Sequence, residues 1–182
     1  EQKLLNHLLK SGWHHVSIST DLAQVIKVLP RAETTVVDAY LAPIMNRYLN
    51  AVNQHIKREK LHIMTSAGGL VSRNDYRSKD SLLSGPAGGV VGAAFFGEQA
   101  GYNKIIGFDM GGTSTDVCRF DGEFNYQFEH QIGQFQVVTP VLNIETVAAG
   151  GGSICRFNGE ELCVGPESAG ANPGPACYGA GG

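Results

Sequence analysis

The sequence lacks the features that several classes of protein require. Its 14 lysines and arginines are scattered rather than clustered, which argues against a nucleic-acid partner, because such a partner calls for a basic patch facing the phosphates. No uninterrupted apolar run is long enough to span a bilayer, and no signal-peptide pattern is present. We therefore expect a cytoplasmic protein with no membrane partner.

Cysteine is scarce, and metal-ligand patterns are missing. None of the four cysteines belongs to a C-x-x-C pair, so we expect reduced thiols. His14 and His15 are adjacent and the other histidines stand alone, which argues against a protein-ligated zinc ion. Cys177 has no evident histidine partner and is not expected to be a nucleophile. A formal net charge of −3 with 17% charged residues is typical of an ordinary globular protein.

Glycine, in contrast, is abundant. The 24 glycines collect in short clusters, namely S-A-G-G, S-G-P-A-G-G, D-M-G-G-T-S-T, A-A-G-G-G-S and a long glycine- and proline-rich run over residues 168–182. Clusters of this kind indicate backbone that lies close to a ligand or to another backbone. The last run is too rich in glycine and proline for regular structure, and is either a substrate loop or a disordered tail.

Hydrophobic periodicity predicts helices and strands in the first half of the chain. The expected elements are a helix over 1–13, a strand over 14–20 with Thr20 or Asp21 capping the next helix, a long helix over 35–57 that is kinked at Pro43, and a strand over 61–66. The long helix and the strand after it supply part of a β-α-β pattern, so the predicted fold class is α/β.

Residues 84–101 are predicted to form another helix, although they are poor in helix formers. Interior glycines such as Gly89 and Gly92 each cost about 1 kcal/mol relative to alanine, so another interaction must compensate. Small residues, Gly88 among them, share one face of this helix. Either a nucleotide approaches that face, with Gly88 and Gly89 in contact with it, or the face only packs tightly.

A glycine bend lies in the segment G-F-D-M-G-G-T-S-T-D-V at residues 107–117, between predicted strands over 104–110 and 115–120. It is not a P-loop, because no lysine follows the glycines, and it is not the dinucleotide fingerprint, because a strand rather than a helix follows. What remains is a strand–turn–strand cradle whose amides and hydroxyls suit phosphate oxygens. The residues that would line this cradle are Gly111, Gly112, Thr113, Ser114 and Thr115.

Two aspartates accompany the bend. A carboxylate does not attract phosphate, so the useful role of Asp109 is to hold Mg²⁺, directly or through water, or to orient an attacking group. Asp116 is a second carboxylate within reach. The alternative interpretation is a tight β-turn with a capping aspartate. A later glycine run, with Gly151, Gly152 and Ser153, is either a second anion or substrate loop or a structural turn.

Two Asx-Gly pairs, at 121–122 and 158–159, predict β-hairpins after the bend, because a type I′ turn needs positive φ at both central residues. Both pairs lie in a C-R-F-[DN]-G-E segment that follows G-G-x-S, which is either an internal repeat or a coincidence. In a two-residue hairpin at 158–159, Cys155 lies opposite Leu162 rather than Cys163, which argues against a disulfide between the two cysteines.

Taken in order, these blocks resemble the hydantoinase A and 5-oxoprolinase family of the actin-like ATPase superfamily. The likeness is carried by S-G-P-A-G-G-V-V-G-A, G-F-D-M-G-G-T-S-T-D-V, A-A-G-G-G-S-I and V-G-P-E-S-A-G-A-N-P-G-P-A-C-Y-G, with T-T-V-V-D-A-Y-L-A-P and I-M-T-S-A-G-G-L-V-S upstream. It implies actin-like (ribonuclease H-like) lobes, with residues 1–83 ending the first lobe and 84–182 forming a hinge helix and the start of the second. The family's earlier D-x-G-G-T-type loop and later adenosine segment are missing, so we expect an inactive fragment.

The same resemblance implies an ATP-dependent hydrolase that opens a lactam or imide, such as 5-oxoproline or a hydantoin, after phosphorylation of its carbonyl oxygen. ATP and Mg²⁺ would be the cofactors, and a partner subunit or domain of a larger assembly is implied. Asp109 would manage Mg²⁺ and the γ-phosphate beside Asp116, and residues 111–113 would hold phosphate oxygens. Two alternatives stay open: a subunit of an ATP-dependent ketone carboxylase, and an ATP-gated binding or chaperone-like protein that shares only the cradle.

Overall fold

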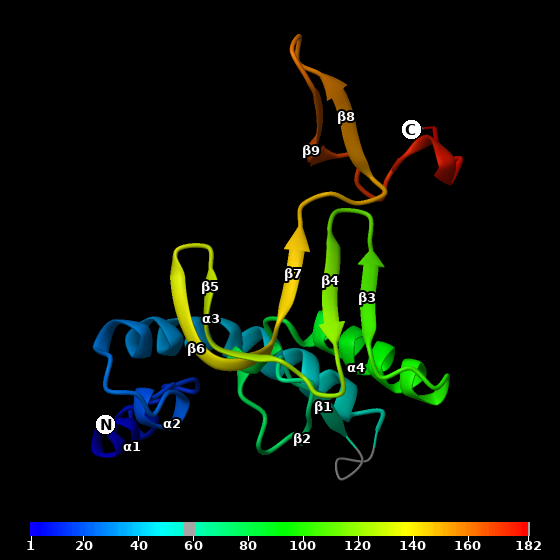
Figure 1. Ribbon diagram of the computed structural model, residues 1–182. Helices are drawn as coiled ribbons and strands as arrows, with labels where there is room; N and C mark the ends of the chain where they lie inside the picture. The colour runs from blue at the N-terminus through cyan, green and yellow to red at the C-terminus, as the bar shows by residue number, and fades with distance from the viewer. Residues whose placement is uncertain (57–60, 182) are drawn as a thin grey trace. The chain divides into compact units, whose positions relative to one another are not determined.

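The computed structural model describes residues 1–56 and 61–181 and is mixed α/β (Figure 1). Its helical elements are α1 (Gln2–Lys10), α2 (Ser19–Leu22), α3 (Val28–Asn53), η2 (Ser78–Ser81), α4 (Ser84–Gln99) and η3 (Ala176–Tyr178). Its strands are β1 (His62–Met64), β2 (Leu70–Ser72), β3 (Ile105–Met110), β4 (Thr115–Phe120), β5 (Tyr126–Ile132), β6 (Phe135–Leu142), β7 (Ile144–Val147), β8 (Ser153–Phe157) and β9 (Leu162–Ser168). The chain divides into two compact units, residues 1–88 with 125–142 and residues 89–124 with 143–182.

The N-terminal region departs from the sequence prediction at two points. The strand expected over 14–20 is wrong, since α2 begins at Ser19 and the residues before it pair with no other strand. Polar contacts fix this segment instead: the Ser17 hydroxyl donates to Asp38 at 2.6 Å, and the Ser19 hydroxyl donates to Glu1 at 2.7 Å. Neither Thr20 nor Asp21 caps the next helix, because both lie inside α2.

The long helix α3 forms as predicted, but it begins seven residues earlier, at Val28 rather than residue 35. Pro30 does not prevent this start, because it lies in the first turn, where a backbone N–H has no partner within the helix. Pro43 lies inside the helix without ending it, and the kink expected there stays a prediction. The last predicted residue, 57, is outside the described residues.

The core of the first unit lies between α3 and the β5–β6 hairpin. Thr34 of α3 is fully buried, and its hydroxyl accepts a hydrogen bond from the Val138 N–H at 2.8 Å. Val137, Val141 and Leu142 of β6 are buried in the same region, with at most 2% of each side chain exposed. The edge of β6 is therefore tied to a helix by a side chain as well as by apolar packing.

A buried polar cluster joins η2 to the same hairpin. The Lys79 ammonium donates to the Asp80 carboxylate and to the Thr139 hydroxyl, both at 2.8 Å. The Thr139 hydroxyl donates in turn to Asp80 at 2.7 Å. Lys79 and Thr139 are buried, so their polar side chains depend on this cluster for hydrogen bonds.

Replacing Lys79 with methionine should lower the free energy of unfolding by about 2–4 kcal/mol, because the largely buried Asp80 carboxylate loses its cation and the buried Thr139 hydroxyl loses a donor. The matched control is Lys27→Met. Lys27 also pairs with a carboxylate, that of Glu129, but its side chain is 62% exposed, and removing such a surface pair costs less than about 1 kcal/mol. Chemical denaturation of both variants checks this, and equal losses would contradict it.

The strand predicted over 61–66 is confirmed as β1, but its partner is unexpected. β1 pairs with β2 in an antiparallel hairpin that turns through Gly68, whose φ is +77°. Every strand pair within the described residues is antiparallel. The β-α-β pattern expected around the long helix is therefore not seen in this part of the chain.

In the second unit, α4 packs on the antiparallel sheet formed in the order β3-β4-β7. A Cβ atom on Gly97 would lie 2.2 Å from Ile105 Cδ1, and one on Gly107 would lie 3.6 Å from the Ala93 Cβ. Close packing of helix on sheet thus accounts for glycine at position 97, whereas a Cβ atom on Gly89 or Gly92 would meet nothing within 4 Å. The helix ends as predicted near Gly101, whose φ is +87°.

The two Asx-Gly pairs have different outcomes. No hairpin forms at 121–122, because β3 and β7 occupy both edges of β4, and β5 pairs with β6 instead. The β8–β9 hairpin does form around Asn158, with a longer loop than predicted: Phe157 pairs with Leu162, and the Asn158 carboxamide accepts the N–H groups of residues 160 and 161. Cys155 therefore lies opposite Val164, and all four cysteines are free, as expected.

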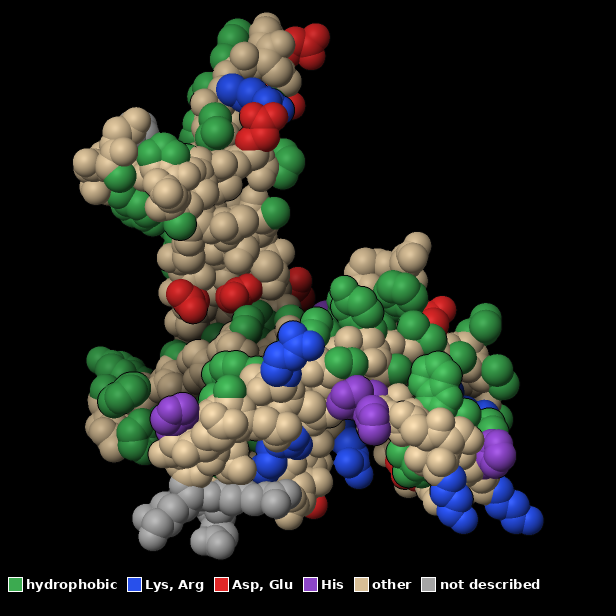
Figure 2. All heavy atoms as spheres, turned by 180° about the vertical axis from the view of Figure 1, so that it is seen from behind, with side chains coloured by type: hydrophobic (Ala, Val, Ile, Leu, Met, Phe, Trp, Pro, Cys, Tyr) green, Lys and Arg blue, Asp and Glu red, His purple; other side chains and the backbone are tan. Residues whose placement is uncertain are grey.

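Large apolar side chains are exposed in several places, as the space-filling view illustrates (Figure 2). On β3 they alternate with the residues that face α4: Ile106 is 77% exposed, Phe108 66% and Met110 56%. Among the described helices, none combines the length and apolar character needed to cross a membrane.

Candidate functional site

The glycine bend connects β3 to β4, between the paired residues Met110 and Thr115. The Gly111 N–H donates to the Ser114 carbonyl at 2.9 Å and closes the turn, so this amide is used internally, contrary to expectation. The N–H groups of Gly112, Thr113 and Ser114 donate to no other group in the described chain. Successive unpaired amides of this kind form a concave anion site.

The carbonyl side of the bend is held by the second glycine run. The Gly151 N–H donates to the Gly111 carbonyl at 2.9 Å, and the Gly152 N–H donates to the Gly112 carbonyl at 2.7 Å. In a trans peptide the C=O and N–H bonds point in opposite directions. Fixing these two carbonyls therefore turns the amides of Gly112 and Thr113 away from the second run, which leaves them free for an anion.

Gly150 makes the closest approach to the bend. A Cβ atom at this position would lie 2.5 Å from the Gly111 oxygen, 2.7 Å from the Gly112 carbonyl carbon and 2.8 Å from the Thr113 nitrogen. All three are backbone atoms, so no side-chain rotation can relieve the overlap. This glycine is needed because one backbone lies directly against another.

The hydroxyl groups predicted for the cradle fall into two classes. Thr115 is buried, and its hydroxyl donates to the Ala149 carbonyl at 2.6 Å, so it attaches β4 to the second run. Thr113 is exposed and Ser114 is half-buried, and neither hydroxyl has a hydrogen-bond partner in the described chain. Ser153 also acts within its own run, where its hydroxyl accepts the Gly150 N–H at 2.8 Å.

The two aspartates lie on one face of the sheet. Asp109 of β3 is directly opposite Asp116 of β4, and side chains of directly opposed residues share a face. Asp116 accepts a hydrogen bond at 2.7 Å from Thr146, its partner on β7. Asp109 is exposed and accepts no hydrogen bond from the described residues. The Asp116 carboxylate is thus held by a hydrogen bond, and the Asp109 carboxylate opposite it is free to bind a cation.

The structure also limits how a metal ion can be held. Within residues 1–56 and 61–181 there is no group of three or more acidic, histidine or cysteine side chains that would hold a metal ion by itself. Mg²⁺ commonly takes one or two carboxylates and completes its shell with water and substrate phosphates. The pair of aspartates fits that pattern, provided that phosphate oxygens supply the remaining ligands.

The contacts of α4 place its second half, rather than its first glycines, on the sheet. Gly97 lies against Ile105 and Ala93 against Gly107, both in the first half of β3. A Cβ atom on Gly89 would meet nothing within 4 Å, and one on Gly88 would lie 4.0 Å from Met64 Cγ, in the first unit. A contact of Gly88 or Gly89 with a nucleotide therefore stays a prediction.

Comparison with known proteins identifies the family of this chain. The family model described as hydantoinase/oxoprolinase matches residues 31–182. The chain belongs to the hydantoinase/oxoprolinase family. The 5-oxoprolinase of Saccharomyces cerevisiae is 45% identical over 176 residues, which is 94% of this chain and 14% of that protein. The chain thus spans about one seventh of the length of this relative.

Two solved structures of similar fold are also known. The ATP-dependent caprolactamase from Pseudomonas jessenii superposes with a TM-score of 0.80 at 32% identity, over 100% of this chain and 28% of that one. A nucleotide-free acetone carboxylase gives 0.71 at 31% identity, over 91% of this chain and 24% of the other. The mixed α/β arrangement and the family resemblance expected from the sequence are thereby confirmed.

In this member of the hydantoinase/oxoprolinase family, the predicted site residues of the bend lie together with those of the second glycine run, whereas the structure does not bring Gly88 or Gly89 into contact with them. The bend and Asp109 carry the free amides and the free carboxylate, whereas Gly151 and Gly152 donate to the bend and Ser153 bonds to Gly150. Sequence reasoning missed Thr146 and Gly150. Nothing in the sequence marked Thr146, but Gly150 belongs to the A-A-G-G-G-S cluster, whose glycines indicated a close backbone approach.

Proposed function

We propose that this chain carries a phosphate-binding part of an ATP-dependent enzyme that opens cyclic amides of the 5-oxoproline or hydantoin type. The observation that carries the proposal is the row of unpaired amides at Gly112, Thr113 and Ser114, next to the unpartnered carboxylate of Asp109. Similarity to 5-oxoprolinase and to an ATP-dependent caprolactamase supports it. ATP would supply a phosphoryl group that activates the amide carbonyl toward water.

Different residues of the site would bind the phosphate groups and the metal ion. The amides at 112–114 would bind terminal phosphate oxygens, with the free hydroxyls of Thr113 and Ser114 as further donors. Asp109, with Asp116 beside it, would hold Mg²⁺ together with those phosphates. Thr146 would fix the orientation of Asp116, and Gly89 would leave room for the nucleotide above the sheet.

The wider assembly belongs to the same proposal. Residues 1–83 would end one actin-like lobe, and residues 84–182 would supply the hinge helix and the start of the next. We also infer a cytoplasmic protein whose other nucleotide contacts come from a further domain or subunit, as the name of the related caprolactamase subunit alpha suggests for that protein. The chain alone is then expected to bind Mg²⁺-ATP weakly or not at all, because phosphoryl transfer needs groups on several sides.

A second activity is favoured by a separate observation, the structural likeness to acetone carboxylase. The same phosphate site would serve an enzyme that activates a ketone rather than an amide. The two readings differ in the carbonyl compound that stimulates ATP use, not in the residues of the bend.

An ATP hydrolysis assay of the full protein distinguishes these activities. We expect 5-oxoproline, a hydantoin or a simple lactam to raise the rate by about tenfold or more over the rate without substrate, because productive closure requires the bound substrate. Acetone with bicarbonate serves as the comparison. If only acetone with bicarbonate raises the rate of ATP hydrolysis, the carboxylase activity is supported instead. If no compound changes that rate, both proposed activities are contradicted.

A further inference from the structure

The buried Gly152 connects the glycine bend to a segment that the proposed function leaves unused. Its N–H donates to the Gly112 carbonyl at 2.7 Å, and its own carbonyl accepts the N–H of Ala169, also at 2.7 Å. Ala169 directly follows β9 and lies in the glycine- and proline-rich run, of which the structure describes residues 168–181. One residue is therefore hydrogen-bonded both to the bend and to the start of this run.

Atoms of the bend and of β9 also pack closely around Gly152. A Cβ atom at this position would lie 2.9 Å from the Gly112 oxygen and 3.0 Å from Ser168 Oγ. Ser168 is the last residue of β9, and it pairs with Ser153 at the base of the β8–β9 hairpin. Its hydroxyl accepts the Gly170 N–H at 3.2 Å. The end of β9 thus lies directly against Gly152 on one side, and the bend lies against it on the other.

The contact with Gly152 bears on an amide that the bend leaves free. The Gly112 carbonyl and the Thr113 N–H belong to one trans peptide unit, so they point in opposite directions. The Thr113 N–H donates to no other group in the described chain. A displacement of Gly152 that moves the Gly112 carbonyl therefore changes the direction of an amide proposed to bind phosphate.

The run beyond Ala169 is folded on itself. The Tyr178 N–H donates to the Pro175 carbonyl at 2.9 Å. Gly174 is buried, and a Cβ atom there would lie 2.5 Å from Cδ2 of the Tyr178 ring. A folded segment passes a displacement on to its neighbours, whereas a disordered one absorbs it. The run is therefore able to influence Gly152 through its first residues.

We propose that Ser168 and Ala169 are positioning residues for the glycine bend, and that the run they begin is coupled to the bend through Gly152. The proposal rests on the proposed function, because it takes the bend to bind the phosphates of ATP. Coupling between two sites is reciprocal. Phosphate binding at the bend should stabilise the hydrogen bond between Ala169 and Gly152, and loss of that hydrogen bond should weaken phosphate binding.

Hydrogen exchange of the full protein without nucleotide tests the connection itself. Ala169→Pro removes the N–H that Gly152 accepts, and the amides of residues 150–153 should exchange about threefold to tenfold faster, as expected for the loss of one hydrogen bond. Ala169→Ser keeps the N–H and should keep the slow exchange. Ser168→Ala leaves every backbone N–H in place and should also speed the exchange, and Ser168→Thr should restore it. The serine variants keep the test decisive if the proline variant does not fold.

Titration of the same proteins with Mg²⁺-ATP tests the coupling. The affinity should fall about threefold to tenfold in Ala169→Pro and in Ser168→Ala. Mg²⁺-ATP should in turn slow the exchange of residues 168–170 in the wild type. A change in exchange that depends on nucleotide is not expected of residues that only support the fold.

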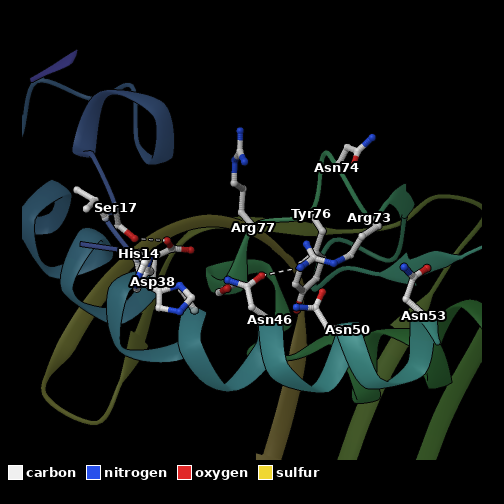
Figure 3. A pocket seen from close by; sticks show the side chains of 14 residues that line it. His14, Ser17, Asp38, Asn46, Asn50, Asn53, Arg73, Asn74, Tyr76 and Arg77 are labelled. Carbon is white, nitrogen blue, oxygen red and sulfur yellow. Dashed lines mark hydrogen bonds between the residues drawn. The ribbon is translucent and has the colours of Figure 1, made fainter. Parts of the chain in front are cut away.

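Ser17→Ala is the matched control, because it also removes a serine hydroxyl that forms a hydrogen bond. The Ser17 hydroxyl donates to Asp38 at 2.6 Å beside a polar cavity of about 500 Å³ in the other unit (Figure 3). Neither residue contacts the bend or the run. The variant should therefore leave both the Mg²⁺-ATP affinity and the exchange of residues 150–153 unchanged.

The outcomes separate this proposal from the proposed function. If the wild type binds no Mg²⁺-ATP, both are overturned. If the wild type binds Mg²⁺-ATP and the variants at 168 and 169 bind it equally well, this proposal is overturned and the proposed function stands. Unchanged exchange at 150–153 in Ala169→Pro and Ser168→Ala would likewise overturn this proposal alone.

Discussion

Replacing Gly150 with alanine is expected to weaken Mg²⁺-ATP binding to the full protein by about 100-fold or more. The new Cβ atom would lie 2.5 Å from the Gly111 oxygen and 2.8 Å from the Thr113 nitrogen, and the bend must move to admit it. Movement breaks the hydrogen bonds that orient the Gly112 and Thr113 amides. The loss of two hydrogen bonds to a charged phosphate corresponds to a change of this size.

The control for this prediction is the neighbouring glycine. A Cβ atom on Gly151 would meet only the Gly111 oxygen, at 3.8 Å, which is an ordinary contact. Gly151→Ala should therefore bind Mg²⁺-ATP within about threefold of the wild type. Circular dichroism and thermal unfolding of both variants separate a displaced bend from a lost fold. Equal affinities for the two alanine variants would show that the second glycine run does not set the shape of the bend.

Asp109→Asn is expected to lower the rate of substrate-stimulated ATP hydrolysis by about 100- to 1000-fold, the range seen when one charge-stabilising group of an active site is removed. The carboxylate would supply negative charge to Mg²⁺, and the carboxamide does not. Because Asp109 has no hydrogen-bond partner to lose among the described residues, the free energy of unfolding should stay within about 0.5 kcal/mol of the wild type. Steady-state assays over a range of Mg²⁺ concentrations, with denaturation curves, measure both quantities.

A carboxylate on the other face of the same sheet provides the comparison. Glu145 pairs with Val117, one position along from the Asp116 pair, so its side chain points to the opposite face. Glu145→Gln should leave the hydrolysis rate within about twofold of the wild type, because it removes a charge of the same sign without touching the face that Asp109 shares. If Glu145→Gln and Asp109→Asn lower the rate equally, the effect is one of general charge and not of the site.

Much of the local structure follows from short-range patterns. The strands on both sides of the bend were expected where β3 and β4 lie, because apolar residues alternate up to the glycines and again after them. Helix α4 was expected from its cap and stop signals, and it ends at Gln99, two residues before the predicted limit at Gly101. The pairing of the strands was harder to predict. The Asp121-Gly122 turn was expected to join β4 to β5 in a hairpin, but β7 pairs with that edge of β4.

The sequence by itself determined that a glycine bend lies between two strands, that Asp109 and Asp116 flank it, and that its motif blocks belong to one family. The tertiary structure alone decided which groups of the bend are free. The Thr115 hydroxyl donates to the Ala149 carbonyl, 34 residues away, and the Gly111 and Gly112 carbonyls accept hydrogen bonds from the second glycine run. Hydrogen bonds between segments so far apart leave no periodic signal in the sequence, because they depend on how the sheet brings the two loops together.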